Sequence, residues 1–219
     1  VTVAPPRLVA LAVAPADTTL PLGTSAQWRA TGIFSDSTLA DFSDAVAWQA
    51  DPAGILQFDA NGRGTASAVG SAVLRAVLGS ITSPPAAVQV GPAVLAALVI
   101  VPADTSVAHG DGALLRAQGT FTDGNTARVN VAAWSADPGG IVAIDSTGHV
   151  VTLATGRVAV RASAAGVTSA AAGFTVGPAR LVIDGRYGPD TALRAQLDVP
   201  DLGGVLPGAG GSLDAEAEI

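Results

Sequence analysis

The chain has 219 residues, of which 49% are apolar and 13% charged, and its net charge is −7. It contains no cysteine, which excludes disulfides, thiolate metal sites and cysteine nucleophiles. All eleven basic residues are arginine and they form no cluster, which argues against a nucleic-acid partner. No run of about 18 apolar residues occurs, so no membrane-spanning segment is predicted.

The first half of the chain is typical of short strands separated by turns. Residues 26–34 alternate polar and apolar, which is the period of a half-buried strand. Residues 59–62 have the composition of a tight turn. Alanine and valine rather than aromatic residues supply most of the apolar side chains, so we expect a thin core. The predicted strands of this half include 8–13, 26–34, 46–50, 72–77 and 86–90.

The second half repeats the first. Gly32–Asp36 returns 87 residues later as Gly119–Asp123, with a phenylalanine in the middle of each copy. Trp48–Pro52 returns 86 residues later as Trp134–Pro138. One residue has therefore been lost between the two motifs, in a loop, where a change of length costs little.

A joint between strands marks the ends of the repeats. Val90–Ala93 recurs as Val176–Ala179, and Val3–Pro6, near the start of the chain, matches this segment in part. The proline of each joint lacks the backbone donor that a continuing strand needs. We therefore predict an N-terminal strand at 1–6, which is a candidate donor strand, two domains at 7–91 and 92–177, and an incomplete β unit at 178–219.

About seven short strands within some 85 residues predict a sandwich of two sheets for each repeat. The chain is therefore predicted to be all-β, with two tandem sandwiches and a partial third β unit. We expect the tryptophan of each repeat to lie on a central strand and to fill the middle of its sandwich. The predicted core residues are Trp48, Trp134, Phe34 and Phe121.

The repeats resemble the bacterial immunoglobulin-like domains of group 2, which occur as tandem repeats in invasin- and intimin-like adhesins. The resemblance rests on a first strand ending in Val-x-Pro, the Gly-x-Phe-Ser/Thr-Asp motif, the Val/Ala-x-Trp strand and two late glycines. It covers residues 7–176, so 179–219 fall outside it. It implies immunoglobulin-like sandwiches, but it implies no particular activity, because the family uses this fold in many roles.

The two ends of the chain suggest a mode of assembly. Val1–Val3 is similar to the last strand of a repeat whose body is missing, whereas 179–219 are too few residues for a sandwich of the same kind. We expect the head of one subunit to supply a strand to the tail of the next, which would give an open head-to-tail filament. The assembly residues of this hypothesis are Val1, Thr2, Val3, Leu181, Ile183, Leu213 and Ile219. The alternative is a fragment of a longer array, with Val1–Val3 packed on the first repeat.

Other chemistry has weak support in the sequence. His109 and His149 lie in or beside turns with no serine, cysteine or acid at a relay spacing. Asp36, Asp41 and Asp44 could offer oxygens to calcium, but the pattern of a dedicated calcium loop is missing. Trp28 could bind a sugar, although Leu115 at the same place in the second repeat favours a core position. We predict no catalytic, cofactor-binding or metal-binding residues.

The sequence therefore predicts a non-enzymatic extracellular structural protein, the subunit of a bacterial surface fibre, sheath or appendage assembled by β-strand exchange. The expected partner is a further copy of the chain, with a host or environmental glycan or protein as the other partner. A chain beginning at Val1 without methionine favours a removed signal peptide. Two alternatives stay open, namely a stalk segment of an adhesin and a module that binds glycan or a virion surface.

Overall fold

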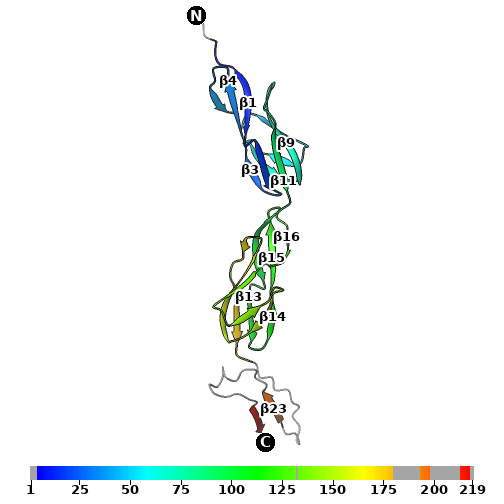
Figure 1. Ribbon diagram of the computed structural model, residues 1–219, viewed down its shortest axis with the longest axis vertical. Coiled ribbons are helices and arrows are strands. Elements are labelled where there is room, and N and C mark those ends of the chain that lie inside the picture. Colours follow the sequence, from blue (N-terminus) through cyan, green and yellow to red (C-terminus); the bar gives the residue numbers. More distant parts are fainter. Residues whose placement is uncertain (1–3, 132, 180–192, 198–212, 218–219) are drawn as a thin grey trace. The chain divides into compact units, whose positions relative to one another are not determined.

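The computed structural model describes residues 4–131 and 133–179, and the backbone of 193–197 and 213–217. Every regular element in these residues is a β-strand (Figure 1). Within them, no helix is long and apolar enough to cross a membrane. The main division between two compact units falls between Ala96 and Ala97. We call the unit formed by β1–β11 sandwich 1 and the unit formed by β12–β22 sandwich 2.

Sandwich 1 consists of two layers of strands. One layer has the order β2–β11–β9–β6, with β10 beside the end of β9. The other layer joins β1–β4–β5 to β3–β8–β7. The strands are β1 (Leu8–Ala14), β2 (Asp17–Pro21), β3 (Ser25–Gln27), β4 (Arg29–Phe34), β5 (Leu39–Asp41), β6 (Ala47–Asp51), β7 (Leu56–Phe58), β8 (Arg63–Ala66), β9 (Gly70–Leu78), β10 (Ile81–Thr82) and β11 (Ala86–Gly91).

The first strand of the sandwich changes layer at Pro15. Before the proline, β1 pairs antiparallel with β4 in one layer. After it, β2 pairs parallel with β11 in the other layer. Proline removes one ladder donor at this point, so a switch between layers here costs no further backbone hydrogen bond.

A second break, at Trp28, separates β3 from β4. Here β3 pairs with β8, whereas β4 pairs with β1. The Trp28 backbone N–H donates to the carbonyl oxygen of Gly62 at 2.9 Å. Gly62 has φ +80°, and a Cβ built on it would lie 2.7 Å from the Trp28 carbonyl oxygen, so only glycine fits there. The break points the Trp28 side chain into the middle of the sandwich, where it is fully buried.

Sandwich 2 repeats this arrangement. One layer is β13–β22–β20–β17 with β21 beside β20, and the other joins β12–β15–β16 to β14–β19–β18. The strands are β12 (Leu95–Val101), β13 (Asp104–Ala108), β14 (Gly112–Leu114), β15 (Arg116–Phe121), β16 (Thr126–Val129), β17 (Ala133–Asp137), β18 (Val142–Ile144), β19 (His149–Thr152), β20 (Gly156–Ala164), β21 (Val167–Thr168) and β22 (Ala172–Gly177). Leu115 stands at the break and donates to the Gly148 carbonyl oxygen at 2.8 Å.

This strand order is that of an immunoglobulin-like sandwich. In the constant type, strands A, B, E and D form one layer and strands C, F and G the other. In sandwich 1, β1, β3 with β4, β8 and β7 occupy the first set of places, and β6, β9 and β11 the second. The predicted fold class, all-β with tandem immunoglobulin-like sandwiches, is confirmed.

The two cores place their largest side chain in opposite layers. In sandwich 1, Trp28 is the large residue at the strand break and Val88 faces the core from β11, both in one cluster. In sandwich 2, the corresponding residues are Leu115 and Phe174, each 1% exposed. A large and a small residue have exchanged layers, which conserves the filled volume. The sequence favoured a core position for Trp28 without naming it among the main core residues, and it did not identify Phe174.

The tryptophans predicted as the central core residues lie at the edge of their sheets. Trp48 and Trp134 are half-buried on β6 and β17, which pair with β9 and β20 respectively and with no further strand in the described residues. The expectation of a central strand was wrong, because alternation of polar and apolar residues is the same in edge and central strands. Trp48 still packs on the core and stacks on Phe58, with ring centroids 5.4 Å apart.

The predicted phenylalanines close the ends of two strands. Phe34 ends β4 and Phe121 ends β15, and both are half-buried. The Phe34 ring lies 6.1 Å from that of Phe42, measured between centroids. These residues therefore lie at one end of the core, whereas Trp28 and Leu115 occupy its middle.

The C-terminal part contains one hairpin. β23 (Leu193–Leu197) pairs antiparallel with β24 (Leu213–Ala217) over five residue pairs. Within the described residues, neither strand pairs with a third.

The exchange of large and small core residues can be tested by a double-mutant cycle in sandwich 1. We expect Trp28→Leu to lower the free energy of unfolding by about 2–4 kcal/mol, because it leaves a cavity, and Val88→Phe to lower it by about 1–3 kcal/mol through overpacking. The double variant should lose less free energy of unfolding than the two single variants lose together. We expect a coupling free energy of about 0.5–3 kcal/mol, measured by urea unfolding. Additive effects within about 0.5 kcal/mol would contradict the exchange.

Candidate functional site

Most of the residues in the strand-exchange hypothesis lie outside the described part of the chain. These are Val1, Thr2, Val3, Leu181, Ile183 and Ile219. Leu213 is the exception, since it begins β24, where its backbone pairs with that of Leu197. The strand-exchange hypothesis therefore stays a prediction.

Asp36, which was weighed as a calcium ligand, and Asp59, in another turn, each accept hydrogen bonds within their own turns. Asp36 Oδ1 accepts from the Thr38 backbone N–H at 3.0 Å and from its hydroxyl at 2.6 Å. Asp59 Oδ1 accepts from the backbone N–H groups of Asn61 and Arg63, both at 2.9 Å. Among the described residues, no group of three acidic, histidine or cysteine side chains is placed to hold a metal ion.

Asp41 has a larger structural role than its turn alone. The hydroxyl of Ser43 donates to Asp41, as does the Ser43 backbone N–H at 2.9 Å, and these two bonds lower the pKa of the Asp41 carboxyl. The Ser43 hydroxyl oxygen also accepts from the Ala30 backbone N–H at 3.0 Å, and its carbonyl oxygen accepts from Trp48 Nε1 at 3.0 Å. Asp41 thereby fixes the loop that holds the Trp48 ring.

The two histidines are not arranged as a catalytic relay. His109 Nε2 lies 3.3 Å from the carbonyl oxygen of Leu153, and this is the one hydrogen bond to an imidazole ring in the described residues. His149 is exposed, and its backbone N–H donates to Asp145 Oδ1 at 3.0 Å. Among the residues that the structure describes, neither ring is hydrogen-bonded to a serine hydroxyl or a carboxylate, which are the partners of histidine in a nucleophilic relay.

Trp28 is buried and therefore unavailable to a sugar. Its side chain has no exposed surface, and its ring meets Phe58 edge-on with centroids 5.5 Å apart. A sugar-binding aromatic residue must present a ring face to solvent. The core assignment that the sequence favoured for this residue agrees with its burial.

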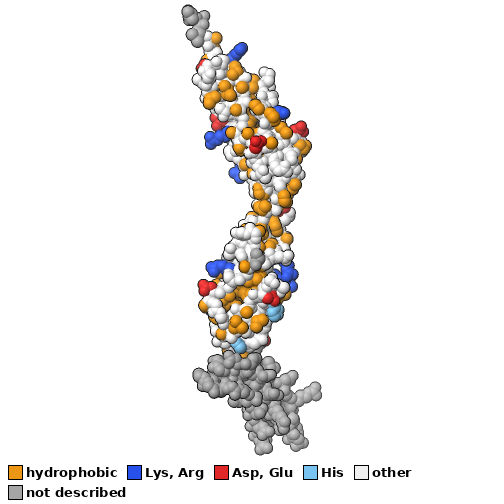
Figure 2. All heavy atoms as spheres, in the orientation of Figure 1, with side chains coloured by type: hydrophobic (Ala, Val, Ile, Leu, Met, Phe, Trp, Pro, Cys, Tyr) orange, Lys and Arg blue, Asp and Glu red, His pale blue; other side chains and the backbone are white. Residues whose placement is uncertain are grey.

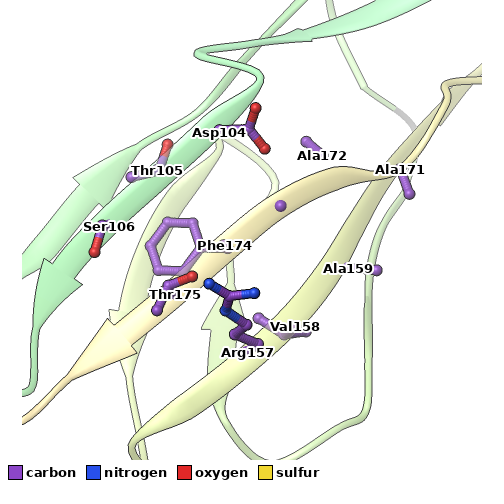
Figure 3. Close-up of a pocket in the computed structure, with 11 residues that line it drawn as sticks. Asp104, Thr105, Ser106, Arg157, Val158, Ala159, Ala171, Ala172, Phe174 and Thr175 are labelled. Carbon is purple, nitrogen blue, oxygen red and sulfur yellow. The ribbon is translucent and has the colours of Figure 1, made fainter.

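A hollow lies on the outer face of the β13–β22–β20 sheet of sandwich 2. Its volume is about 610 Å³. Figure 3 shows Asp104 on β13 at one side and Arg157 on β20 at the other, with the Arg157 guanidinium reaching toward Thr175 on β22. Ala159 and Gly173 also line it. The hollow thus offers a carboxylate, a guanidinium and a hydroxyl around a floor of small residues.

The same place in sandwich 1 is occupied by larger side chains. Ala87 stands where sandwich 2 has Gly173, and Val73 where it has Ala159. The two positions together carry three more carbon atoms in sandwich 1 than in sandwich 2. The hollow was missed by sequence reasoning, but alignment of the two repeats contains the signal, namely two residues that both become smaller on one face.

The chemistry of the hollow suits binding rather than hydrolysis. Asp104 is the one acid among its lining residues, whereas glycoside hydrolysis uses a pair of carboxylates. A carboxylate and a guanidinium beside a floor of small residues can hydrogen-bond to a ligand that carries several hydroxyls.

Comparison with known proteins places this chain beside surface and ice-binding proteins. No protein-family model matches it. It is similar to Ice-binding protein 1 of Shewanella frigidimarina (strain NCIMB 400), with 30% identity over 135 residues, which is 61% of this chain and 15% of that protein. The chain thus spans about 15% of the length of the curated relative that it matches.

Several of the similar solved structures are of bacterial surface layer or adhesin proteins. They include domains 1–6 of the surface layer protein SbsC, with 14% identity, 91% of this chain and 32% of that chain covered, and a TM-score of 0.39. The Yersinia pseudotuberculosis adhesin InvE has 16% identity, coverages of 92% and 70%, and a TM-score of 0.33. Invasin, a bacterial integrin-binding protein, has 10% identity, coverages of 76% and 38%, and a TM-score of 0.37. At these values the fold is assigned from the strand pairing itself.

The role of Asp41 predicts a pH-dependent effect of its replacement. Because hydrogen bonds from Ser43 lower the pKa of Asp41 below its ordinary 3.8, its contribution to stability is complete above that pH and is lost as the pH falls through the lowered pKa. Asp41→Ala should therefore lower the melting temperature at pH 7, and the difference from the unaltered protein should shrink below pH 3.8. Asp44→Ala, at an exposed neighbour outside this hydrogen-bonded chain, serves as the control for thermal unfolding by circular dichroism. If Asp41→Ala lowered the melting temperature equally at pH 7 and pH 3, the proposed stabilising role of the ionised Asp41 would be contradicted.

Proposed function

We propose that this chain is a non-enzymatic structural segment of a bacterial extracellular surface protein, in which group 2 immunoglobulin-like domains act as a spacer. The observation that carries the proposal is the tandem repetition of one complete sandwich. Each repeat has its own buried centre, at Trp28 and at Leu115. Domains that fold around separate cores can be repeated to any length, as a stalk requires.

The comparison with the curated relative supports a segment rather than a whole protein. The matched 135 residues make up 15% of Ice-binding protein 1. The name of that protein says that it binds ice. For this chain we propose spacing as the main role, and we do not propose ice binding.

Assembly into a fibre by strand exchange is the second proposed role. The observation that favours it is the β23–β24 hairpin, which has two strands in the described residues and no third. An unpaired strand edge is a template for a strand from another chain. A head-to-tail partner of this kind would be a further copy of the chain itself.

Electron microscopy of the purified chain separates these two roles. If the chain is a spacer, we expect single particles at high concentration, and removal of residues 1–6 should leave them unchanged. If the chain forms fibres, and these disappear when residues 1–6 are removed, the strand-exchange role would be supported and the spacer role rejected. Fibres that persist after the removal would eliminate the N-terminal strand as the donor.

Glycan binding is a third role, favoured by the hollow of sandwich 2. We expect any glycan retained on an array to be lost when the hollow is filled with the residues of sandwich 1, in the variant Ala159→Val/Gly173→Ala. A Cβ at Gly173 would lie 2.7 Å from Asp104 Oδ1, so this change also displaces the carboxylate. The matched control is the reverse change in sandwich 1, Val73→Ala/Ala87→Gly. Equal binding by both variants would exclude the hollow as the site.

A further inference from the structure

Sandwich 2 exposes an apolar sheet face that sandwich 1 lacks. We call the outer surface of β14–β19–β18 the apolar face. Leu114, Val151 and Leu153 are 45%, 51% and 51% exposed on it. Val151 pairs in register with Gly112 on one side and with Ala143 on the other. The exposed His149 lies on the same face and pairs with Leu114, so the apolar side chains border one imidazole. Figure 2 shows hydrophobic side chains, with a histidine and an acidic side chain beside them, over the part of sandwich 2 where Figure 1 labels β14.

The corresponding face of sandwich 1 is polar. Gln27, Thr65 and Ser67 stand in the places of Leu114, Val151 and Leu153, and the remaining positions carry further polar residues. The hydroxyls of Ser25 and Thr65 are hydrogen-bonded across the strands at 2.9 Å. Gln27 Nε2 donates to the carbonyl oxygens of Trp28 and Asn61.

The apolar residues are therefore not needed to form this sheet. β3–β8–β7 has the same strand order and antiparallel pairing with polar residues outside. An apolar side chain that faces water contributes no hydrophobic free energy to folding. A contiguous exposed apolar patch on one of two otherwise equivalent domains marks a contact with another part of the protein or with a partner.

The chain leaves sandwich 2 beside this face. The Gly177 carbonyl oxygen, at the end of β22, accepts from the His109 backbone N–H at 3.0 Å. The His109 ring in turn lies 3.3 Å from the carbonyl oxygen of Leu153 on the apolar face. Thirteen residues, 180–192, then separate the described end of sandwich 2 from β23. Fully extended, they reach about 45 Å, which exceeds the length of a five-residue strand.

The C-terminal hairpin has the sequence of a layer that requires a cover. Apolar and polar residues alternate in both of its strands. The register pairs Leu193 with Ala217 and Leu197 with Leu213, while Arg194 pairs with Glu216. Apolar positions thus share one face of the hairpin and charged positions share the other. A two-stranded hairpin is marginally stable in water by itself, unless its apolar face packs on something.

We propose that the β23–β24 hairpin docks its apolar face on the apolar face of sandwich 2 in the same chain. The occupant is this hairpin because it follows sandwich 2 directly, through a connection that begins beside Leu153. Sandwich 1 is followed by another sandwich and has the polar version of the face. The interaction completes sandwich 2 as a domain with a C-terminal cover, and it is independent of the role proposed for the whole protein.

The absence of cysteine from the chain permits a direct cross-linking test on the full-length protein. In the variant Val151→Cys/Ala195→Cys, a short bismaleimide should join the two cysteines within one chain. The matched control, Thr65→Cys/Ala195→Cys, uses the equivalent position of sandwich 1. We expect intrachain cross-linking to be about tenfold faster in the first variant, because docking raises the effective concentration.

The cross-linking result can overturn the proposal in two ways. Equal rates in the two variants would show that the hairpin does not prefer the apolar face. Products that join two chains, and that vanish on dilution, would make a second copy the occupant.

A second variant tests the docking without added cysteines. Leu114→Gln/Val151→Thr/Leu153→Ser gives the face the residues that sandwich 1 carries in the same strand pairing, so the sandwich should still fold. Tryptic cleavage after Arg194 should become about tenfold faster, because an undocked hairpin opens more often. Val99→Thr/Val101→Thr, at valines that are 50% and 45% exposed elsewhere on sandwich 2, is the control. Unchanged cleavage in the triple variant would contradict the proposal.

Discussion

The hydrogen bond across the strand break is the interaction on which each sandwich depends. It joins the backbone N–H of Trp28 to Gly62, and that of Leu115 to Gly148, at 2.9 and 2.8 Å. Each glycine lies so close to the carbonyl oxygen of the residue at the break that a side chain on the glycine would collide with that oxygen. Because the break redirects one strand from β8 to β1, it connects the two halves of its layer and points the residue at the break into the core.

The two sandwiches share this constraint but differ in the surfaces built around it. Sandwich 2 has a hollow where Gly173 and Ala159 replace larger residues, and an apolar face where leucine and valine replace glutamine and threonine. Neither difference alters the strand order. A fold fixed by its backbone hydrogen bonds and its buried centre leaves outward positions free to vary, and these positions are where a tandem repeat acquires separate roles.

The acidic side chains of the two sandwiches lie in different surroundings. In sandwich 1, Asp36, Asp41 and Asp59 accept hydrogen bonds in their own turns, and the hollow of sandwich 2 is lined by a single acid. The hairpin after sandwich 2 gives the second domain a different neighbour from the first. In one proposed role it covers the domain that precedes it, and in another it receives a strand from a further chain. The two do not exclude each other, since docking uses the face on which the apolar positions lie, whereas strand addition uses an edge of the hairpin.

The amino-acid sequence alone determined the repeat, its period, the all-β class and the prolines at the strand ends, because alternation and turn chemistry are local properties. Only the tertiary structure decided which side chain fills each centre. Trp48 looked central, but β6 pairs only with β9 in the described residues, and Trp28 occupies the middle. Trp28 and Val88 lie in one core although they are distant in the chain, as do the corresponding Leu115 and Phe174. The residues that line the hollow also come from separate strands. Such features depend on which strands meet across the sandwich, and a pattern read along one strand carries no record of its neighbours.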